Sequence, residues 1–300
     1  MESKIRSALV IGGVNVDICG YPSNAICLHD SNPGHVKFNP GGVGRNIAHN
    51  LSLLGMKTDM LTAIGGDSFS GFVREALQSA GIGTAVSETF PDMASSVYMY
   101  ITDSDGDMLV AVSDMDIVSM ITPDVIRKRL DIINSYDAVV IDANLSQETI
   151  IYIAENCTAP LFADPVSGAK APKLIPVLKY LHAVKPNMLE AAVLSGCDDP
   201  NDAADKLLSL GTDKVFISLG SRGILAADNS SRISIPAEIV NVVNTNGAGD
   251  AASAAMIYGC TAGMNLEETG KLCVKAGALT SSTNETNFPG LSSILADISI

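Results

Sequence analysis

Positive charge, histidine and long apolar runs are all scarce in this sequence, and each shortage excludes a class of function. Lysine and arginine number 19 against 33 aspartates and glutamates, so the net charge is −14, which disfavours nucleic acid and anionic membranes as partners. No apolar run reaches the length of a membrane-spanning helix, and the polar residues 1–6 do not resemble a signal peptide. None of the four histidines has metal-ligand spacing, so we expect no structural zinc site.

Paired cysteines are also missing. The six cysteines include no Cys-x-x-Cys pair, and several lie in apolar runs, as reduced core thiols do. We therefore expect a reducing, cytoplasmic location.

The remaining composition is that of one large α/β domain. The chain has 300 residues, and 47% of them are hydrophobic, enough for a sizeable core. Strand-like and helix-like patterns alternate, which predicts a parallel sheet covered by helices on both faces. The predicted strands are 7–11, 58–64, 138–141, 161–163, 183–184 and 215–219, and the predicted helices are 69–80, 123–133, 148–156, 188–194 and 203–210.

Two other segments do not fit a central sheet. Residues 18–39 hold two short strand-like runs around the turn-rich stretch from Asp30 to Gly34. Residues 95–113 read as a hairpin with a polar turn at its centre. We expect the two segments to form a small β lid, inserted into a domain that spans residues 1–300.

The stretch from Asn244 to Asp250 carries the strongest chemical signal. It follows a β-like run, residues 239–243, and opens a small-residue helix, Ala251 to Tyr258. Backbone N–H groups at such a helix start attract anions, and glycine allows phosphate oxygens to approach closely. Asp250 would then accept a proton from a hydroxyl that attacks phosphate, while the Gly247–Gly249 backbone stabilises developing charge. A capped turn with Asp250 in the first helical turn explains the stretch equally well.

Polar side chains also follow the first strand. Asn15 and Asp17 alternate with valines and therefore point to one face, where they offer donors and acceptors for a diol. A polar strand edge is the alternative. The glycine-rich run from Gly41 to Asn46 leads into a helix that ends at Gly55, and places Asn46 beside the same edge.

Two further motifs have both a structural and a functional interpretation. Asn187 and Glu190 match a helix capping box, and they are also suited to organising Mg²⁺, largely through water. The turn from Ser218 to Gly223 suits a nucleotide or a tight hairpin. The glycine spacing of dinucleotide sites and the Walker loop are both missing from the sequence.

Two of these stretches resemble the two signature patterns of the ribokinase-like, or PfkB, carbohydrate kinase family. The first runs from Gly41 through Asn46 to Gly55 and Gly65, and the second runs from Asn244 to Met256. Residues 185–190 and 218–223 resemble the motifs between them, so the resemblance covers nearly the whole chain. It implies a ribokinase-like three-layer sandwich with a central, mostly parallel sheet and a small β-sheet lid.

The resemblance also implies a role for each matching residue, with ATP and Mg²⁺ as cofactors. Asp250 resembles the catalytic base, and Gly247, Ala248 and Gly249 resemble the anion hole. The implied ribose contacts are Asn15, Asp17, Gly42 and Asn46. The implied ATP and Mg²⁺ positions are Asn187, Glu190, Ser218, Gly220, Gly223, Gly247 and Gly249. Asn244 stands where the family often has an aspartate that helps to hold a monovalent cation, so the resemblance leaves K⁺ activation open.

Within the family, the stretches 30–34, 41–48, 142–145 and 164–173 resemble the pseudouridine kinase subgroup. The implied reaction is ATP-dependent phosphorylation of the nucleoside's 5′-hydroxyl. Asp30, Ser31 and Asn32 together complement the edge of a uracil, although a solvated turn explains them too. Adenine contacts are expected near residues 271–282, where a plain packed helix fits equally well. Exposed lid strands favour a homodimer. The rival functions are another sugar or nucleoside kinase, or a catalytically silent sensor.

Overall fold

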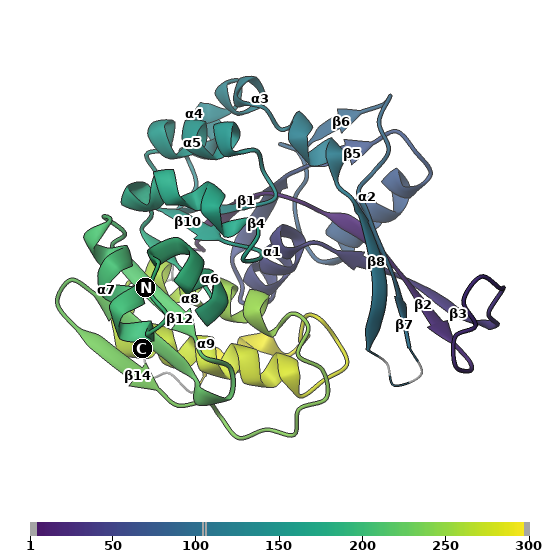
Figure 1. Cartoon of the computed structure of the whole chain (residues 1–300). Helices are drawn as coiled ribbons and strands as arrows, with labels where there is room; N and C mark the ends of the chain where they lie inside the picture. The colour runs from purple at the N-terminus through teal and green to yellow at the C-terminus, as the bar shows by residue number, and fades with distance from the viewer. Residues whose placement is uncertain (1–4, 104, 106, 297–300) are drawn as a thin grey trace.

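A computed structural model describes residues 5–103, 105 and 107–296, and its centre is an eight-stranded sheet (Figure 1). Six strands are parallel, and an antiparallel pair extends one edge. The spatial order is β14 (Arg232–Ile235), β13 (Ile224–Asp228), β12 (Lys214–Ser218), β11 (Ala183–Val184), β10 (Leu161–Asp164), β9 (Ala138–Asp142), β1 (Ser7–Ile11) and β4 (Lys57–Leu61).

Both faces of this sheet are buried. Because successive strand side chains point in opposite directions, each strand contributes to two hydrophobic clusters. In β1, Ala8 and Val10 join one hydrophobic cluster, whereas Leu9 and Ile11 join the other. The first cluster is covered by α1 (Val43–Leu53), α2 (Phe69–Ser79), α8 (Ala248–Ala262), α9 (Leu266–Ser281) and η4 (Leu291–Leu295). The second is covered by η1 (Asp116–Met120), α3 (Pro123–Arg127), α4 (Leu130–Ile133), α5 (Gln147–Asn156), η2 (Ala171–Tyr180), α6 (Met188–Ser195) and α7 (Pro200–Ser209). The predicted three layers are confirmed.

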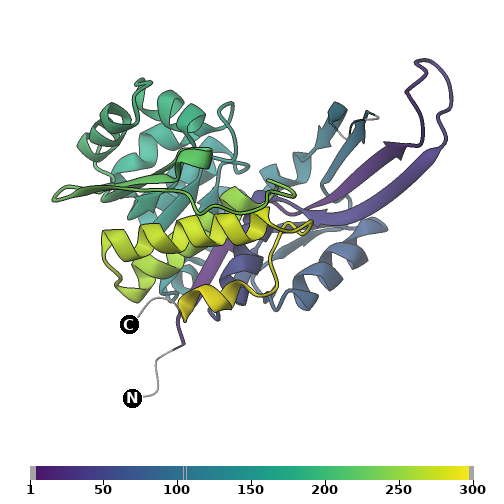
Figure 2. The same cartoon turned by 90° about the horizontal axis from the view of Figure 1, so that it is seen from below.

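A separate four-stranded sheet projects from this body, as both views show (Figures 1 and 2). Its order is β3 (Gly34–Gly41), β2 (Asn15–Pro22), β7 (Val97–Thr102) and β8 (Met108–Asp114). The predicted hairpin of β7 and β8 is confirmed. The first strand starts at Asn15, earlier than the predicted residue 18, because Asn15 and Asp17 pair with Gly41 and Asn39 of β3.

Some predicted elements have different bounds. The helix expected over 123–133 is split into α3 and α4. The strand expected over 58–64 is divided between β4 and β5 (Ala63–Gly65), and β5 pairs with β6 (Glu88–Phe90) in a separate two-stranded sheet. Residues 239–243 were expected to be β-like, but they form no strand. The sheet edge beside β12 is occupied by the β13–β14 hairpin, and Ile239 is fully exposed. Among the described residues, no helix is both long and apolar enough to cross a bilayer.

The two-sided core predicts a steep cost for truncating a large side chain at the centre of the sheet. Phe162 in β10 is fully buried in the first cluster, so Phe162→Ala should destabilise the fold by roughly 3–5 kcal/mol. Leu189→Ala is the matched control, because Leu189 is 79% exposed, and it should change stability by less than about 0.5 kcal/mol. Urea denaturation measures both, and equal costs would contradict the assignment of Phe162 to the core.

Candidate active site

The first turn of α8 presents unpaired backbone amides. Gly247 is the N-cap with a φ of 81°, and a Cβ there would collide with the backbone oxygen of Thr286, so only glycine fits. The amide of Ala248 donates to the Thr245 carbonyl (3.3 Å). The amides of Gly249 and Asp250 have no acceptor among the described residues. An anion at this helix end would therefore meet two free N–H groups and the positive end of the helix dipole.

Asp250 lies in this turn and contacts helix α1. Its carboxylate accepts a hydrogen bond from the side-chain amide of Asn46 (2.7 Å). Burial, and then the nearby Asp164 carboxylate, raise the pKa of Asp250 to about 7, although Asn46, Lys185 and Arg45 oppose the rise. A carboxyl group with a pKa near neutrality can accept a proton from a hydroxyl and release it again.

Arg45 and Asn287 hold the first turn of α1 in place. Arg45 is 4% exposed and donates to the Asn287 side-chain oxygen (3.0 Å) and to the Pro40 carbonyl. Asn287 in turn donates to the backbone oxygen of Asn46 (3.0 Å). Burial lowers the pKa of Arg45 to about 10, and Asp250 and Asp17 counteract this effect. Arg45 therefore remains a cation at neutral pH, and its charge is stabilised by the carboxylates of Asp250 and Asp17.

Asn15 and Asp17 lie on one face of β2, as predicted. The Asn15 amide donates to the Asp17 carboxylate, and a Cβ on Gly41 would collide with the same carboxylate. Burial raises the pKa of Asp17 to about 6, against the effects of Arg45 and Asn15. Gly42 has a φ of 101°, and a Cβ on it would lie 2.6 Å from the Gly13 carbonyl. Glycine is required here for the close approach of the two loops.

Asp142, at the end of β9, ties these loops to the sheet. It is completely buried, and one carboxylate oxygen accepts the amides of Gly13 (2.9 Å) and Gly44 (3.2 Å). The other accepts the amide of Asn144 (2.9 Å). Burial raises the pKa of Asp142, and the hydrogen bonds from Gly13 and Asn144 oppose the rise. One buried carboxylate thus fixes the ends of β1, α1 and β9 relative to one another.

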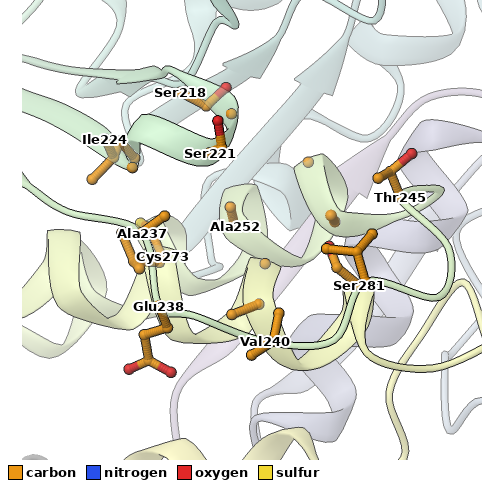
Figure 3. A pocket seen from close by; sticks show the side chains of 18 of the residues that line it. Ser218, Ser221, Ile224, Ala237, Glu238, Val240, Thr245, Ala252, Cys273 and Ser281 are labelled. Carbon is orange, nitrogen blue, oxygen red and sulfur yellow. The ribbon is translucent and has the colours of Figure 1, made fainter.

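A cavity of about 450 Å³ opens on the other side of the α8 turn (Figure 3). Figure 3 shows Ser218 and Ser221 on one side of it and Val240 and Ser281 on the other. The predicted positions Asn187, Ser218, Gly220, Gly223, Ala248 and Gly249 line it. Its floor includes Cys273, Val274, Gly277 and Ala278 of α9, within the range 271–282 where adenine contacts are expected.

The two motifs with alternative interpretations both have their structural role. Asn187 and Glu190 form a reciprocal capping box at the start of α6, with both hydrogen bonds at 2.9 Å. The Ser218–Gly223 turn joins the antiparallel strands β12 and β13, so it is a hairpin that also borders the cavity. Among the described residues, no group of three or more His, Cys, Asp or Glu side chains could hold a metal ion. Water-mediated binding of Mg²⁺ by Asn187 and Glu190 stays a prediction.

Other predicted residues lie apart from this constellation. Asp30, Ser31 and Asn32 lie at the exposed tip of the β2–β3 loop, which Figures 1 and 2 show far from the body. The Asn32 amide is bonded to the Cys27 backbone in both directions (2.7 and 2.9 Å). The Asn244 side-chain oxygen accepts the amide of Asn246 (3.0 Å). A base contact by the tip and a cation site at Asn244 stay predictions.

Sequence reasoning assigned no role to Arg45, Asp142, Lys185 or Asn287. Lys185 is 4% exposed, and its ammonium lies 4.0 Å from the position that a Cβ on Gly249 would take. Lys185 and Arg45 lie inside the sequence motifs that contain Asn187 and Asn46, and this proximity in sequence could have identified them as site residues. Asn287 comes from a C-terminal loop without periodicity, and no sequence signal identified it.

The comparisons with known proteins agree with this geometry. The model of the pfkB family of carbohydrate kinases matches residues 6–293. The chain belongs to the pfkB family. It is 35% identical over 291 residues to the pseudouridine kinase of Escherichia coli K12, a match that covers 95% of this chain and 93% of that protein. Both comparisons confirm the predicted family.

Two solved structures have the same overall fold as this pfkB-family chain. A carbohydrate kinase from Agrobacterium tumefaciens has a TM-score of 0.87 at 28% identity and covers 97% of both chains. The Arabidopsis thaliana ribokinase complexed with ribose and ATP has a TM-score of 0.85 at 20% identity, covering 97% of this chain and 98% of its own. The ribokinase-like fold is confirmed.

The raised pKa of Asp250 predicts a pH-dependent cost to stability. An aspartate with a pKa of about 7 in the folded chain and 3.8 in the unfolded chain has no effect on stability below pH 3.8, and it lowers stability progressively as the pH rises from 3.8 to 7. Asp250→Asn should therefore gain stability over the wild type, and gain more at pH 8 than at pH 5, by roughly 1–3 kcal/mol given partial solvent access. Thermal unfolding at both pH values measures this. Exposed Asp131→Asn is the control, and a gain independent of pH would contradict the buried carboxyl.

Proposed function

We propose that this protein is an ATP-dependent kinase that phosphorylates the 5′-hydroxyl of pseudouridine to give pseudouridine 5′-phosphate. The observation that carries the proposal is the position of the Asp250 carboxylate. It is hydrogen-bonded to Asn46 at the start of a helix with free amides, between the polar face of Asn15 and Asp17 and the apolar cavity. Two comparisons support the proposal: the chain belongs to a carbohydrate kinase family, and its sequence is 35% identical to a pseudouridine kinase.

The acceptor side has unused hydrogen-bonding capacity for a sugar. The side-chain oxygen of Asn46 is buried and has no partner among the described residues. Its amide nitrogen is already used on Asp250, so the oxygen is free to accept from a substrate hydroxyl. Asp17 offers carboxylate oxygens to a diol. A ribose bound to these groups would place its terminal hydroxyl beside Asp250, which removes the hydroxyl proton as phosphorus is attacked.

The donor side fits a nucleoside triphosphate. The apolar cavity has room for a purine, and its glycine turns allow phosphates to approach the backbone. The free amides of Gly249 and Asp250 and the ammonium of Lys185 would stabilise charge on the transferred group. Mg²⁺, when bound with ATP, supplies further neutralisation of phosphate charge, and Glu190 and Asn187 would hold it through water.

Two further expectations remain part of the proposal. A monovalent cation such as K⁺ would bind near Asn244, whose amide oxygen replaces the aspartate often found there. A cytoplasmic location is supported by the six cysteines, all of which are free thiols.

The rival functions separate in one competition assay. Another family kinase would prefer ribose, fructose, uridine or adenosine over pseudouridine, and a silent sensor would bind one of these without making ADP. The assay measures ADP production with each acceptor at equal concentration. Preference for pseudouridine supports the proposal, and preference for a free sugar, uridine or adenosine, or absence of turnover, overturns it.

Asp250→Asn should lower kcat by roughly 10²–10⁴-fold and change the KM for the acceptor little, because the amide keeps the shape but cannot accept the proton. A coupled ADP assay measures both constants, with Asp131→Asn as the control. Near-normal turnover would remove Asp250 from the mechanism.

The wild-type rate should rise with pH through about 7 and level off above it. The pKa of Asp250 is raised to about 7, and only the ionised carboxylate acts as the base. A profile of kcat/KM against pH measures the midpoint. A rate that falls with increasing pH across this range would contradict the assignment.

We also propose that the four-stranded sheet is a lid and a homodimer interface. Its register aligns Phe38, Ile18, Met99 and Val112 across all four strands, and next to them Val36, Gly20, Ile101 and Val110. Six of these side chains are large, apolar and 39–62% exposed. β8 is an unpaired edge strand on this face, so a second copy would cover both the apolar stripe and the edge.

Val110→Asp should therefore weaken the dimer, because a carboxylate would be buried in the interface. Light scattering should show the wild type at twice the chain mass and the variant shifted toward the monomer. Asp105→Asn, in the nearby exposed turn, is the control. A monomeric wild type would contradict the interface.

A further inference from the structure

A pair of lysines reaches back over the end of β9. After β10 the chain turns at Val166, which has a φ of 65° and whose amide donates to Asp164 (2.8 Å). This turn leads into η2 and brings both lysines beside the residues that follow Asp142. The Lys170 ammonium is 2.5 Å from the Asn144 side-chain oxygen, and the Lys173 ammonium is 2.9 Å from the carbonyls of Ala143 and Leu145.

The two lysines differ in how many of their ammonium N–H groups have a hydrogen-bond acceptor. Lys173 donates to two backbone carbonyls, so it holds the loop after β9 in shape. Lys170 has one acceptor, a side chain, and is only half-buried. An ammonium has three donors, and among the described residues no other acceptor meets those of Lys170. Two N–H groups of Lys170 are therefore available to a ligand.

Contacts along this edge of the sheet connect Lys170 to the acceptor side of the site. Asn46 contacts Asp250, and a Cβ on Gly42 would lie 3.0 Å from the Asn15 oxygen and 2.6 Å from the Gly13 carbonyl. A Cβ on Gly13 would in turn lie 3.3 Å from the amide nitrogen of Asn144, which holds Lys170. These contacts run from Asp250 through Asn46, Gly42 and Gly13 to Asn144, whose side-chain oxygen binds Lys170, and Lys170 makes no contact with Asp250 among the described residues.

We propose that Lys170 is a specificity-determining residue that donates a hydrogen bond to a carbonyl oxygen of the substrate's nucleobase. The inference rests on the proposed function, since a nucleoside with its 5′-hydroxyl at Asp250 extends its base away from Asp250. Uracil has a carbonyl next to the glycosidic bond whether it is linked through carbon or nitrogen, and adenine has none. Lys170 therefore selects for uracil-type bases over adenine, while the ribose contacts are common to both.

The test compares nucleoside and sugar in Lys170→Met, which keeps the length of the side chain and removes its donors. The expected result is a fall in kcat/KM for pseudouridine and for uridine of about tenfold to a hundredfold, carried by KM. Ribose has no base, so its kcat/KM should fall far less. The ratio of kcat/KM for pseudouridine to kcat/KM for adenosine should fall by the same factor.

Lys173→Met is the matched control. Loss of its two backbone hydrogen bonds should lower the melting temperature and affect ribose and pseudouridine alike. If Lys170→Met lowers kcat/KM equally for ribose and pseudouridine, or leaves the KM for pseudouridine unchanged, Lys170 does not contact the nucleobase. If the wild type phosphorylates no nucleoside, the proposed function fails separately. Calorimetric binding of uridine against ribose in the same variant then tests Lys170, and equal losses of affinity for both would overturn it.

Discussion

The hydrogen bond from Asn46 to Asp250 joins the first turns of two helices, and the site is arranged around it. α1 begins at a glycine loop near β1, and α8 begins at a glycine loop near the C-terminus, so residues far apart in sequence meet at one carboxylate. The bond holds the Asp250 carboxylate against α1, while Ala248 and Gly249 of the same turn line the cavity. Because Asp250 is partly buried and lies near Asp164, its pKa rises to about 7, and its charge is costly to hold.

The sheet supports this contact through buried carboxylates at its strand ends. Asp142 binds the amides of Gly13 and Gly44, which fixes α1 against β1 and β9. Asp164, one strand further along, accepts the Ser253 hydroxyl (2.8 Å), which fixes α8 against β10. Parallel strands bring their carboxyl ends to the same edge, so two neighbouring strands can anchor the two helices that carry the site. The same few buried polar groups therefore tie the helices to the sheet and hold the candidate site in place.

Much of the fold followed from periodicity and from turn residues. Alternating strands and helices indicated three layers, and the small-residue run from Ala251 indicated a helix, which in the structure starts slightly earlier, at Ala248. Where prediction failed, a neighbour decided the outcome. Residues 239–243 have strand-like composition, yet the β13–β14 hairpin occupies the adjacent edge, and Val240 and Val242 line the cavity instead. The Ser218–Gly223 turn left two interpretations open, and the structure contains both a hairpin and a cavity wall.

The sequence by itself determined the residue types that phosphoryl chemistry needs and the local turns that hold them, because glycine conformations, helix caps and apolar periodicity are short-range properties. The tertiary structure alone decided which of those residues meet. It brought Arg45 and Asn287 together behind Asp250, left Asp30, Ser31 and Asn32 at an exposed tip, and placed Lys170 on Asn144. Such contacts depend on loop paths between distant elements, and a side chain's protonation depends on how deeply those loops bury it. Neither the contacts between distant loops nor the burial of a side chain can be read from a single stretch of sequence.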